Sequence, residues 1–270
     1  MSPYSVAPVP AGDADIARIA ALIGDRARAR VLMALADGRA LPASVLAAEA
    51  RVAASTISEH LARLVAAQLL TAERQGRARY FRLADPSVAE ALEAIARIAP
   101  PEPIRSLRQG SRAHALRRAR TCYNHLAGRL GVAVMAALLD RAVLTGGDGY
   151  HHREASEVDR LAAPGADLTY RLTHDGRDEL AAFGLDLDAL GRRRPAIRYC
   201  VDWSEQRHHL AGPLGAAMTH RMFELGWLRR TNHRRAVTLT DAGHHGLHDT
   251  FGVPDDWDDV SAGRGRRSSG

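Results

Sequence analysis

The chain has 270 residues, a length that allows two domains, each with its own hydrophobic core. Hydrophobic residues make up 46% of the sequence and charged residues 25%, as in an ordinary globular protein, and a formal net charge of +6 suits an anionic partner such as DNA. The sequence shows no export leader and no apolar run of about 18 residues, and two cysteines are too few for a disulfide scaffold, so we expect a cytoplasmic protein with no membrane span.

The N-terminal end predicts a short flexible segment followed by two helices. Residues 1–12 are rich in proline and small side chains, which favours a loosely ordered start. Residues 13–38 should form the two helices, because a capping aspartate precedes each one (Asp13 or Asp15, then Asp25) and a glycine follows each one.

Residues 41–66 predict a helix, a turn and a second helix. Pro42 suits the first position of a helix, and residues 51–53 make the turn. The second helix carries an apolar stripe at helical spacing, formed by Ile57, Leu61 and Leu64. Its other face holds small or polar groups able to reach base edges or phosphates: Ala54, Ser55, Thr56, Ser58, Glu59, His60 and Arg63.

Residues 69–83 predict a basic β-hairpin directly after this helix pair. Gln75 and Gly76 stand at its tip, and four arginines fall within nine residues. We expect DNA contacts from Arg74, Gln75, Arg77 and Arg79. A helix pair followed by an arginine-rich hairpin is typical of a winged helix-turn-helix.

The segments VAASTISEHL (52–61) and GRARYFRL (76–83) resemble the ArsR/SmtB family of bacterial repressors. The shared features are a small polar start of the recognition helix, a His-Leu pair and a Gly-Arg-x-x-Tyr-x-x-Leu wing, and the match covers about residues 16–98. The resemblance implies a DNA-binding domain over residues 13–99. One departure is Ala53, because the family usually has a serine there and a helix cap typically contributes ~1 kcal/mol.

Residues 85–98 predict the last helix of this domain, with Asp85 as its cap, proline next and an apolar stripe behind. The resemblance implies that the first and last helices form a homodimer that binds a palindromic operator in double-stranded DNA. Packing of the last helix on its own domain is the alternative. Residues 100–120 should be a proline-rich linker and a basic helix, which either touches phosphates or is a solvated face.

Residues 121–253 contain an internal repeat. The motif HLAGRLG (125–131) recurs as HLAGPLG (209–215), and each copy continues as a helix, a strand-like segment, a Leu-Thr helix start and a closing Phe-Gly. We therefore predict two winged-helix-like repeats, 121–185 and 200–253, and a mainly α fold with small β-hairpin wings (α+β) for the whole chain. Neither repeat has an arginine-rich hairpin, so we expect this domain to sense or assemble. Residues 254–270 should be a disordered tail.

The two cysteines precede the two copies of the repeat. The metal sites of the resembled family are missing, because residues 43–48 hold no cysteine and residues 87–98 hold no histidine. Cys122 and His125 should share one helical face, and Cys200 with His208 and His209 offers a matching set.

Three interpretations of these residues stay open. Two thiolates and two imidazoles bind zinc or a softer metal if the copies face each other. The cysteines could instead be a redox pair. They could also be small core residues, and the effector a small organic molecule in an apolar cleft lined by Tyr123, Trp203 and Trp227.

These patterns together predict a dimeric DNA-binding transcription regulator, a repressor by its resemblance, with no catalytic residue. A Cys/His enzyme is a rival, but no orienting residue or oxyanion motif accompanies the pairs. A second rival is an architectural protein that binds nucleic acid without sequence choice. The sequence names neither the operator nor the effector.

Overall fold

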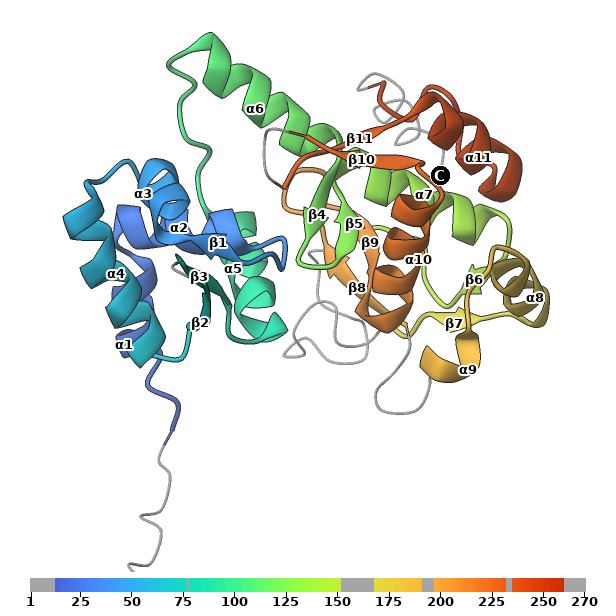
Figure 1. Ribbon diagram of the computed structural model, residues 1–270. Helices are drawn as coiled ribbons and strands as arrows, with labels where there is room; N and C mark the ends of the chain where they lie inside the picture. Colours follow the sequence, from blue (N-terminus) through green and yellow to red (C-terminus); the bar gives the residue numbers. More distant parts are fainter. Residues whose placement is uncertain (1–12, 77, 152–167, 191–196, 232–234, 260–270) are drawn as a thin grey trace, which may run out of the picture.

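The chain forms two domains that lie side by side, the N-terminal one drawn blue to teal and the C-terminal one green to red (Figure 1). The structure is a computed structural model, and it describes residues 13–76, 78–151, 168–190, 197–231 and 235–259. The predictions for residues 1–12, Arg77 and residues 260–270 lie outside these described ranges. No helix in the described part is both long and apolar enough to cross a membrane.

The N-terminal domain has eight elements around one core: α1 (Ile16–Ile23), α2 (Arg26–Leu35), β1 (Leu41–Pro42), α3 (Ala43–Ala50), α4 (Ala54–Ala66), β2 (Leu70–Gln75), β3 (Ala78–Leu83) and α5 (Pro86–Ile98). Its antiparallel sheet has the order β1-β3-β2. The predicted hairpin is present, since β2 pairs with β3 from Leu70↔Leu83 to Gln75↔Ala78. The sequence thus predicted both the helix pair and the wing.

Local capping explains where these helices begin. The carboxylates of Asp15, Asp25 and Asp85 accept hydrogen bonds from the first turns of α1, α2 and α5, as predicted. Pro42 differs from its prediction by one position, because it pairs with Tyr80 in the sheet and the helix begins at Ala43. Ala53 precedes α4 without any side-chain cap, so the departure noted in the sequence is real.

The C-terminal domain follows the proline-rich linker and α6 (Leu107–Arg118). Each copy of the repeat runs hairpin, helix, hairpin, helix. The first contains β4 (Arg120–Cys122), β5 (His125–Ala127), α7 (Gly128–Asp140), β6 (Leu144–Thr145), β7 (Arg171–Leu172) and α8 (His174–Ala182). After α9 (Leu187–Leu190), the second contains β8 (Arg198–Val201), β9 (His208–Ala211), α10 (Gly212–Glu224), β10 (Leu228–Arg230), β11 (Val237–Leu239) and α11 (Asp241–Phe251).

The predicted helix, hairpin and threonine-capped helix are present in both copies. Thr173 caps α8 and Thr240 caps α11, each through its side-chain oxygen. The rings of Phe183 and Phe251, which close the two copies, lie 5.0 Å apart in an edge contact. The chain therefore has the predicted α+β fold, mainly helical with small antiparallel hairpins.

The helical face predicted for Cys122 and His125 is wrong. These residues stand opposite each other on β4 and β5, joined by a two-residue turn in which Tyr123 has φ +57°. The error has a physical reason: side chains three apart meet on a helix, and they also meet across a two-residue hairpin turn. A hairpin therefore begins each copy.

The two copies interlock through their first helices and hairpins. Helix α7 packs on β9 and α10 packs on β5, so each copy covers the strand of the other. A Cβ atom on Gly131 would lie 2.6 Å from the carbonyl oxygen of Leu126, and one on Gly215 equally close to that of Leu210. The last glycine of the repeated motif is thus required where helix and strand approach closely.

Residues 254–259 contradict the predicted disordered tail. Asp258 accepts hydrogen bonds from Arg118 (2.5 Å) and Arg129 (3.0 Å). Trp257 packs against the core of the C-terminal domain, with the Arg118 guanidinium 5.2 Å from its ring. Ion pairs with arginines far away in the sequence hold this acidic segment, and composition alone does not show such partners.

Candidate functional site

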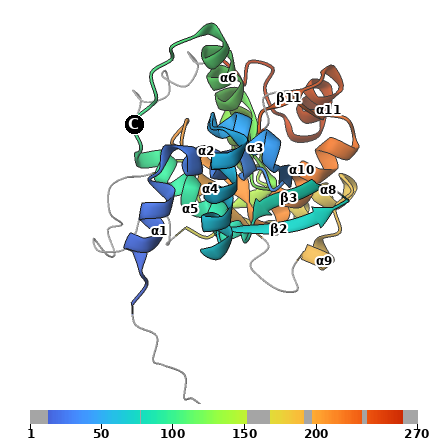
Figure 2. The same ribbon diagram turned by 60° about the vertical axis from the view of Figure 1, so that its left-hand side comes forward.

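Helix α4 presents a polar face to solvent because its apolar stripe (Ile57, Leu61 and Leu64) is buried in the core. Figure 2 shows α4 and the β2–β3 hairpin together at the front of the N-terminal domain. Short side chains on the exposed face of a recognition helix allow close approach to base edges. The exposed members of the predicted set are Ala54, Ser55, Thr56, Ser58, Glu59 and Arg63.

The hairpin next to α4 carries the predicted cationic groups. Arg74, Gln75 and Arg79 are exposed, and Arg74 Nε donates to the carbonyl oxygen of Gly76 at 3.3 Å. Arg82 instead forms an ion pair with Glu73 on the neighbouring strand. Among the described wing residues, Arg74 and Arg79 are therefore best placed to meet phosphates.

Two predicted DNA-contacting residues have partners within the protein. His60 is half-buried, and its Nδ1 lies 3.8 Å from the carboxylate of Asp25 at the start of α2, so it is less accessible to bases than the exposed residues of α4. The guanidinium of Arg63 donates to Glu59 at 2.6 Å along the exposed side of α4. A phosphate would have to compete with Glu59 for this arginine.

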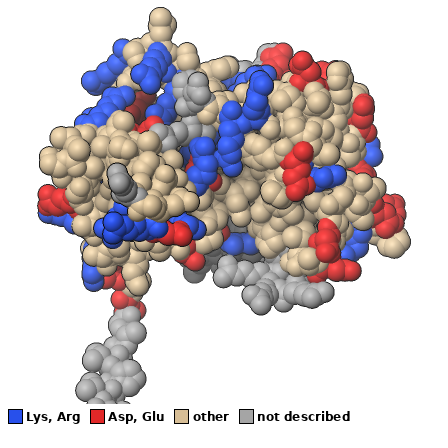
Figure 3. Space-filling model, in the orientation of Figure 1, with Lys and Arg blue, Asp and Glu red and all other residues tan. Residues whose placement is uncertain are grey.

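Basic side chains also gather over α6 and in a band between the two domains (Figure 3). Burial, followed by the nearby charge of Arg39, lowers the pKa of Arg230 at the end of β10. The predicted basic helix α6 is largely engaged with protein, since Arg112 pairs with Glu49 and Arg117 lies over Trp203. Arg120, the last arginine of that run, is fully buried and is not a surface group.

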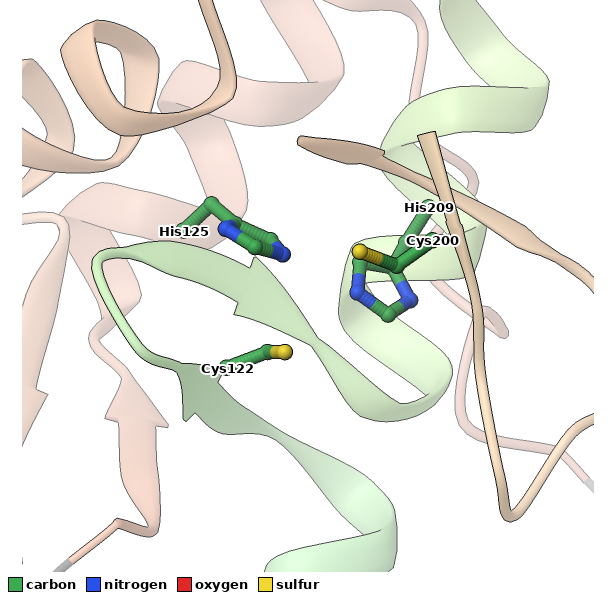
Figure 4. A group of neighbouring side chains, drawn as sticks. All are labelled: Cys122, His125, Cys200 and His209. Carbon is green, nitrogen blue, oxygen red and sulfur yellow. The ribbon is translucent and has the colours of Figure 1, made fainter. Parts of the chain in front are cut away.

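The structure brings together four of the five residues predicted as an effector site. One ligand atom from each of Cys122, His125, Cys200 and His209 lies within 4.8 Å of every other. The two cross-strand pairs, Cys122↔His125 and Cys200↔His209, come from the hairpins that begin the two copies. Figure 4 shows the four side chains pointing toward one another between those hairpins.

His208 does not belong to this cluster. Successive residues of a strand face opposite sides, so His208 and His209 of β9 point apart. The Nδ1 atom of His208 lies 2.7 Å from the hydroxyl of Tyr170 on the other side. The prediction that both histidines join the cysteines is therefore wrong for His208.

The two clustered histidines have matching surroundings. His125 Nδ1 lies 3.4 Å from the amide oxygen of Asn124, and His209 Nδ1 lies 3.3 Å from a carboxylate oxygen of Asp202. The Nε2 atoms of both rings are buried and have no nitrogen or oxygen partner among the described residues. Both rings thus have one nitrogen beside an oxygen and the other without a nitrogen or oxygen partner.

The pKa values in the cluster reflect burial and close partners. A hydrogen bond with Cys200, together with burial, raises the pKa of the Cys122 thiol to about 12. This is opposite to the low pKa of a reactive cysteine. Burial alone would lower the pKa of His209, but Asp202 and Cys122 raise it to about 9. Burial would likewise raise the pKa of Asp202, but Arg120 and His209 hold it well below its usual range.

A buried chain of charges connects the cluster to the N-terminal domain. Beyond His209, Asp202 accepts a hydrogen bond from Arg120 at 3.0 Å. Arg120 lies 3.5 Å from Glu93 of α5, and Glu93 also pairs with Arg235. The sequence patterns did not point to Asp202 or Glu93. The available signal was weak: Asp202 lies two residues after Cys200, and Glu93 is a charge on the apolar side of its helix.

A cleft of about 460 Å³ lies between α5 and β8. Glu93 and Arg97 line one wall and Tyr199, Cys200 and Val201 another, so the half-exposed Cys200 faces this opening. The three aromatic residues predicted to line an effector cleft do not line this one. They have different neighbours. The backbone N–H of Tyr123 donates to the carbonyl oxygen of Ala36, the Trp203 ring lies under the guanidinium of Arg120, and the Trp227 ring packs on Phe183.

Comparisons with known proteins agree on the class of the N-terminal domain. A family model described as a helix-turn-helix domain matches residues 23–73. The chain is 36% identical over 230 residues to the uncharacterized HTH-type transcriptional regulator YdfF of Bacillus subtilis, covering 85% of this chain and 93% of that relative.

Two solved structures are similar to the N-terminal part. The cadmium metal-sensor CMTR of Mycobacterium tuberculosis is 31% identical, with 34% of this chain and 99% of that chain covered and a TM-score of 0.27. The homodimeric winged helix-turn-helix domain of Mb0332 from Mycobacterium bovis is 25% identical, with 33% and 89% covered and a TM-score of 0.29.

Proposed function

The chain belongs to the HTH-type transcriptional regulators, and on this premise we propose that it represses transcription as a homodimer bound to a palindromic operator. In this proposal α4 enters the major groove and the β2–β3 hairpin lies along the flanking backbone. The observation that supports this proposal is that α4 buries its apolar stripe and exposes its polar face, beside the exposed side chains of Arg74 and Arg79.

Apolar residues on the first and last helices of the domain support the dimer. Helix α1 is rich in isoleucine and alanine; Ile19, Leu22 and Ile23 pack partly against the core of their own domain, but no residue of α1 is fully buried. Ile16 at its start is 74% exposed, and Ile98 at the end of α5 is 85% exposed. Isoleucines this exposed are stabilised when a second copy covers them, and a twofold dimer would present two α4 helices to two half-sites.

A genome-wide footprint that includes the protein's own promoter tests this function. We expect a small number of sites that share an inverted repeat, and salt-titrated binding to that sequence should be at least ~10³-fold tighter than binding to scrambled DNA. Equal affinity for both DNAs at every salt concentration would replace the repressor with a non-specific architectural protein.

A further inference from the structure

We propose that Cys122, His125, Cys200 and His209 bind one divalent d¹⁰ metal ion of the zinc type, and that binding changes the affinity for operator DNA. The metal site itself stands on the geometry of the four side chains. Its regulatory effect rests on the proposed DNA-binding function. Neither depends on the metal sites of the ArsR/SmtB family, whose positions lack the required residues.

The ligand set suits a tetrahedral ion. Bonds of about 2.3 Å to sulfur and about 2.0 Å to nitrogen place the four ligand atoms about 3.3–3.8 Å from one another. These atoms now lie within 4.8 Å of one another, so an ion would shorten the longest of these distances by roughly 1–1.5 Å. Each thiol, and any histidine ring that is protonated, would lose a proton to solvent as its bond to the metal forms, so that two thiolates and two neutral rings hold the ion.

The surroundings of the histidines resemble the outer shell of known metal sites. A ligating histidine commonly has its second nitrogen beside a carboxylate or another oxygen, which fixes the ring orientation. Asp202 holds this position at His209 and Asn124 holds it at His125. The buried Nε2 atoms of the two histidines have no nitrogen or oxygen partner in the described part of the chain, which is costly in a folded protein, and a metal ion would satisfy both.

Charge favours a divalent ion. Two thiolates neutralise the charge of M²⁺. Close to the site, the negative charges of Asp202 and Glu93 balance the positive charges of Arg120 and Arg235. A buried site is most stable when its net charge is close to zero. Ions could reach the half-exposed Cys200 through the cleft between α5 and β8.

The same residues connect the site to the DNA-binding domain. Movement of β8 and β9 toward β4 and β5 would shift Asp202, which contacts both His209 and Arg120. Arg120 in turn contacts Glu93 on α5, the helix that we place in the dimer interface. Metal binding would therefore change the distance between the two α4 helices of the dimer, through this series of packed, charged groups.

Cobalt(II) titration of the reduced full-length protein tests the site. We expect one Co²⁺ per chain, visible d–d bands typical of tetrahedral S₂N₂ coordination, and displacement by Zn²⁺. Cys200→Ser and His209→Gln should each weaken binding at least tenfold, in line with the loss of a ligand. His220→Ala is the matched control, because that side chain is 77% exposed and lies on α10 away from the cluster. Thermal unfolding without metal shows whether each variant folds.

Operator affinity with and without Zn²⁺ tests the regulation. Zinc should change the wild-type affinity at least fivefold. Glu93→Gln should still take up one Co²⁺ per chain but lose most of that change. Glu90→Gln changes an exposed residue of the same helix, which pairs with Arg198 of β8, and should keep the change. Operator binding without metal uptake by the wild type would overturn the inference and leave the proposed function standing. Metal uptake with no operator binding would overturn the proposed function instead, and equal operator affinities with and without zinc would overturn the coupling.

Discussion

The residue before α4 leaves the reading helix without a side-chain cap. Ala53 has φ −67° and ψ 158°, the extended conformation that a capping serine adopts, and its side chain offers no acceptor to the first turn. The first N–H groups of α4 stay available to a DNA phosphate, which binds well at a helix N-terminus.

We predict that Ala53→Ser raises the free energy of unfolding by about 1 kcal/mol. Denaturant unfolding followed by circular dichroism measures this change. Ala62→Ser, on the exposed side of α4 beyond its first turn, is the control and should lower stability by about 0.5 kcal/mol. Equal effects at the two positions would show that the missing cap does not limit the stability of α4.

Arg79 tests the role of the wing. Arg79→Ala should weaken binding to operator and random DNA by a similar factor and should reduce the slope of log affinity against log salt by about 1. Fluorescence anisotropy at several salt concentrations measures both. Arg177→Ala removes the same charge from the exposed side of α8 and should change neither, so an equal loss in the two variants would exclude a specific role for the wing.

At the scale of elements, α4 is the part that should determine sequence preference. Thr56→Ala or Ser58→Ala should change which operator bases are tolerated, at about 1–3 kcal/mol for each lost base contact. A selection from randomised operators measures the preference of each variant. Recovery of the wild-type consensus from both variants would show that α4 is not the reader.

Helix α5 should carry the dimer contact. Ile98→Glu should produce monomers in analytical ultracentrifugation and weaken operator binding at least tenfold, while the fold persists because Ile98 lies outside the core. Leu225→Glu puts the same charge on an exposed leucine of the C-terminal domain and should leave the dimer intact. A dimeric Ile98→Glu variant would place the contact elsewhere.

The sequence predicted the elements whose signals are local. Caps and the apolar stripe of α4 act over three or four residues, so α1 to α5 and the wing could be located from the order of residues alone. The hairpin of β4 and β5 could not, because the spacing of Cys122 and His125 fits a helix as well as a tight turn. Because neighbouring side chains of a strand face opposite sides, only one of His208 and His209 on β9 can face the cysteines, and it is His209.

At the scale of the whole molecule, the DNA-reading domain and the repeat domain meet at buried charges. Arg120 lies 27 residues from Glu93 and 82 residues from Asp202 in the sequence, and no periodic pattern relates such distant positions. The repeated motif did predict two similar copies, and it allowed the two cysteines to lie close together if those copies faced each other. Which charged residues surround them depends on the packing of the two domains, which local patterns do not encode.

Thermodynamic linkage tests the two-domain account most directly. Zn²⁺ affinity should be measured with and without saturating operator, and operator affinity with and without saturating Zn²⁺, on the same wild-type preparation. If one protein couples the two sites, both ratios must be equal, and we predict a common factor of about 5–150. Two ratios of 1 would contradict the account, because the Cys-His cluster and the DNA-reading face would then act independently.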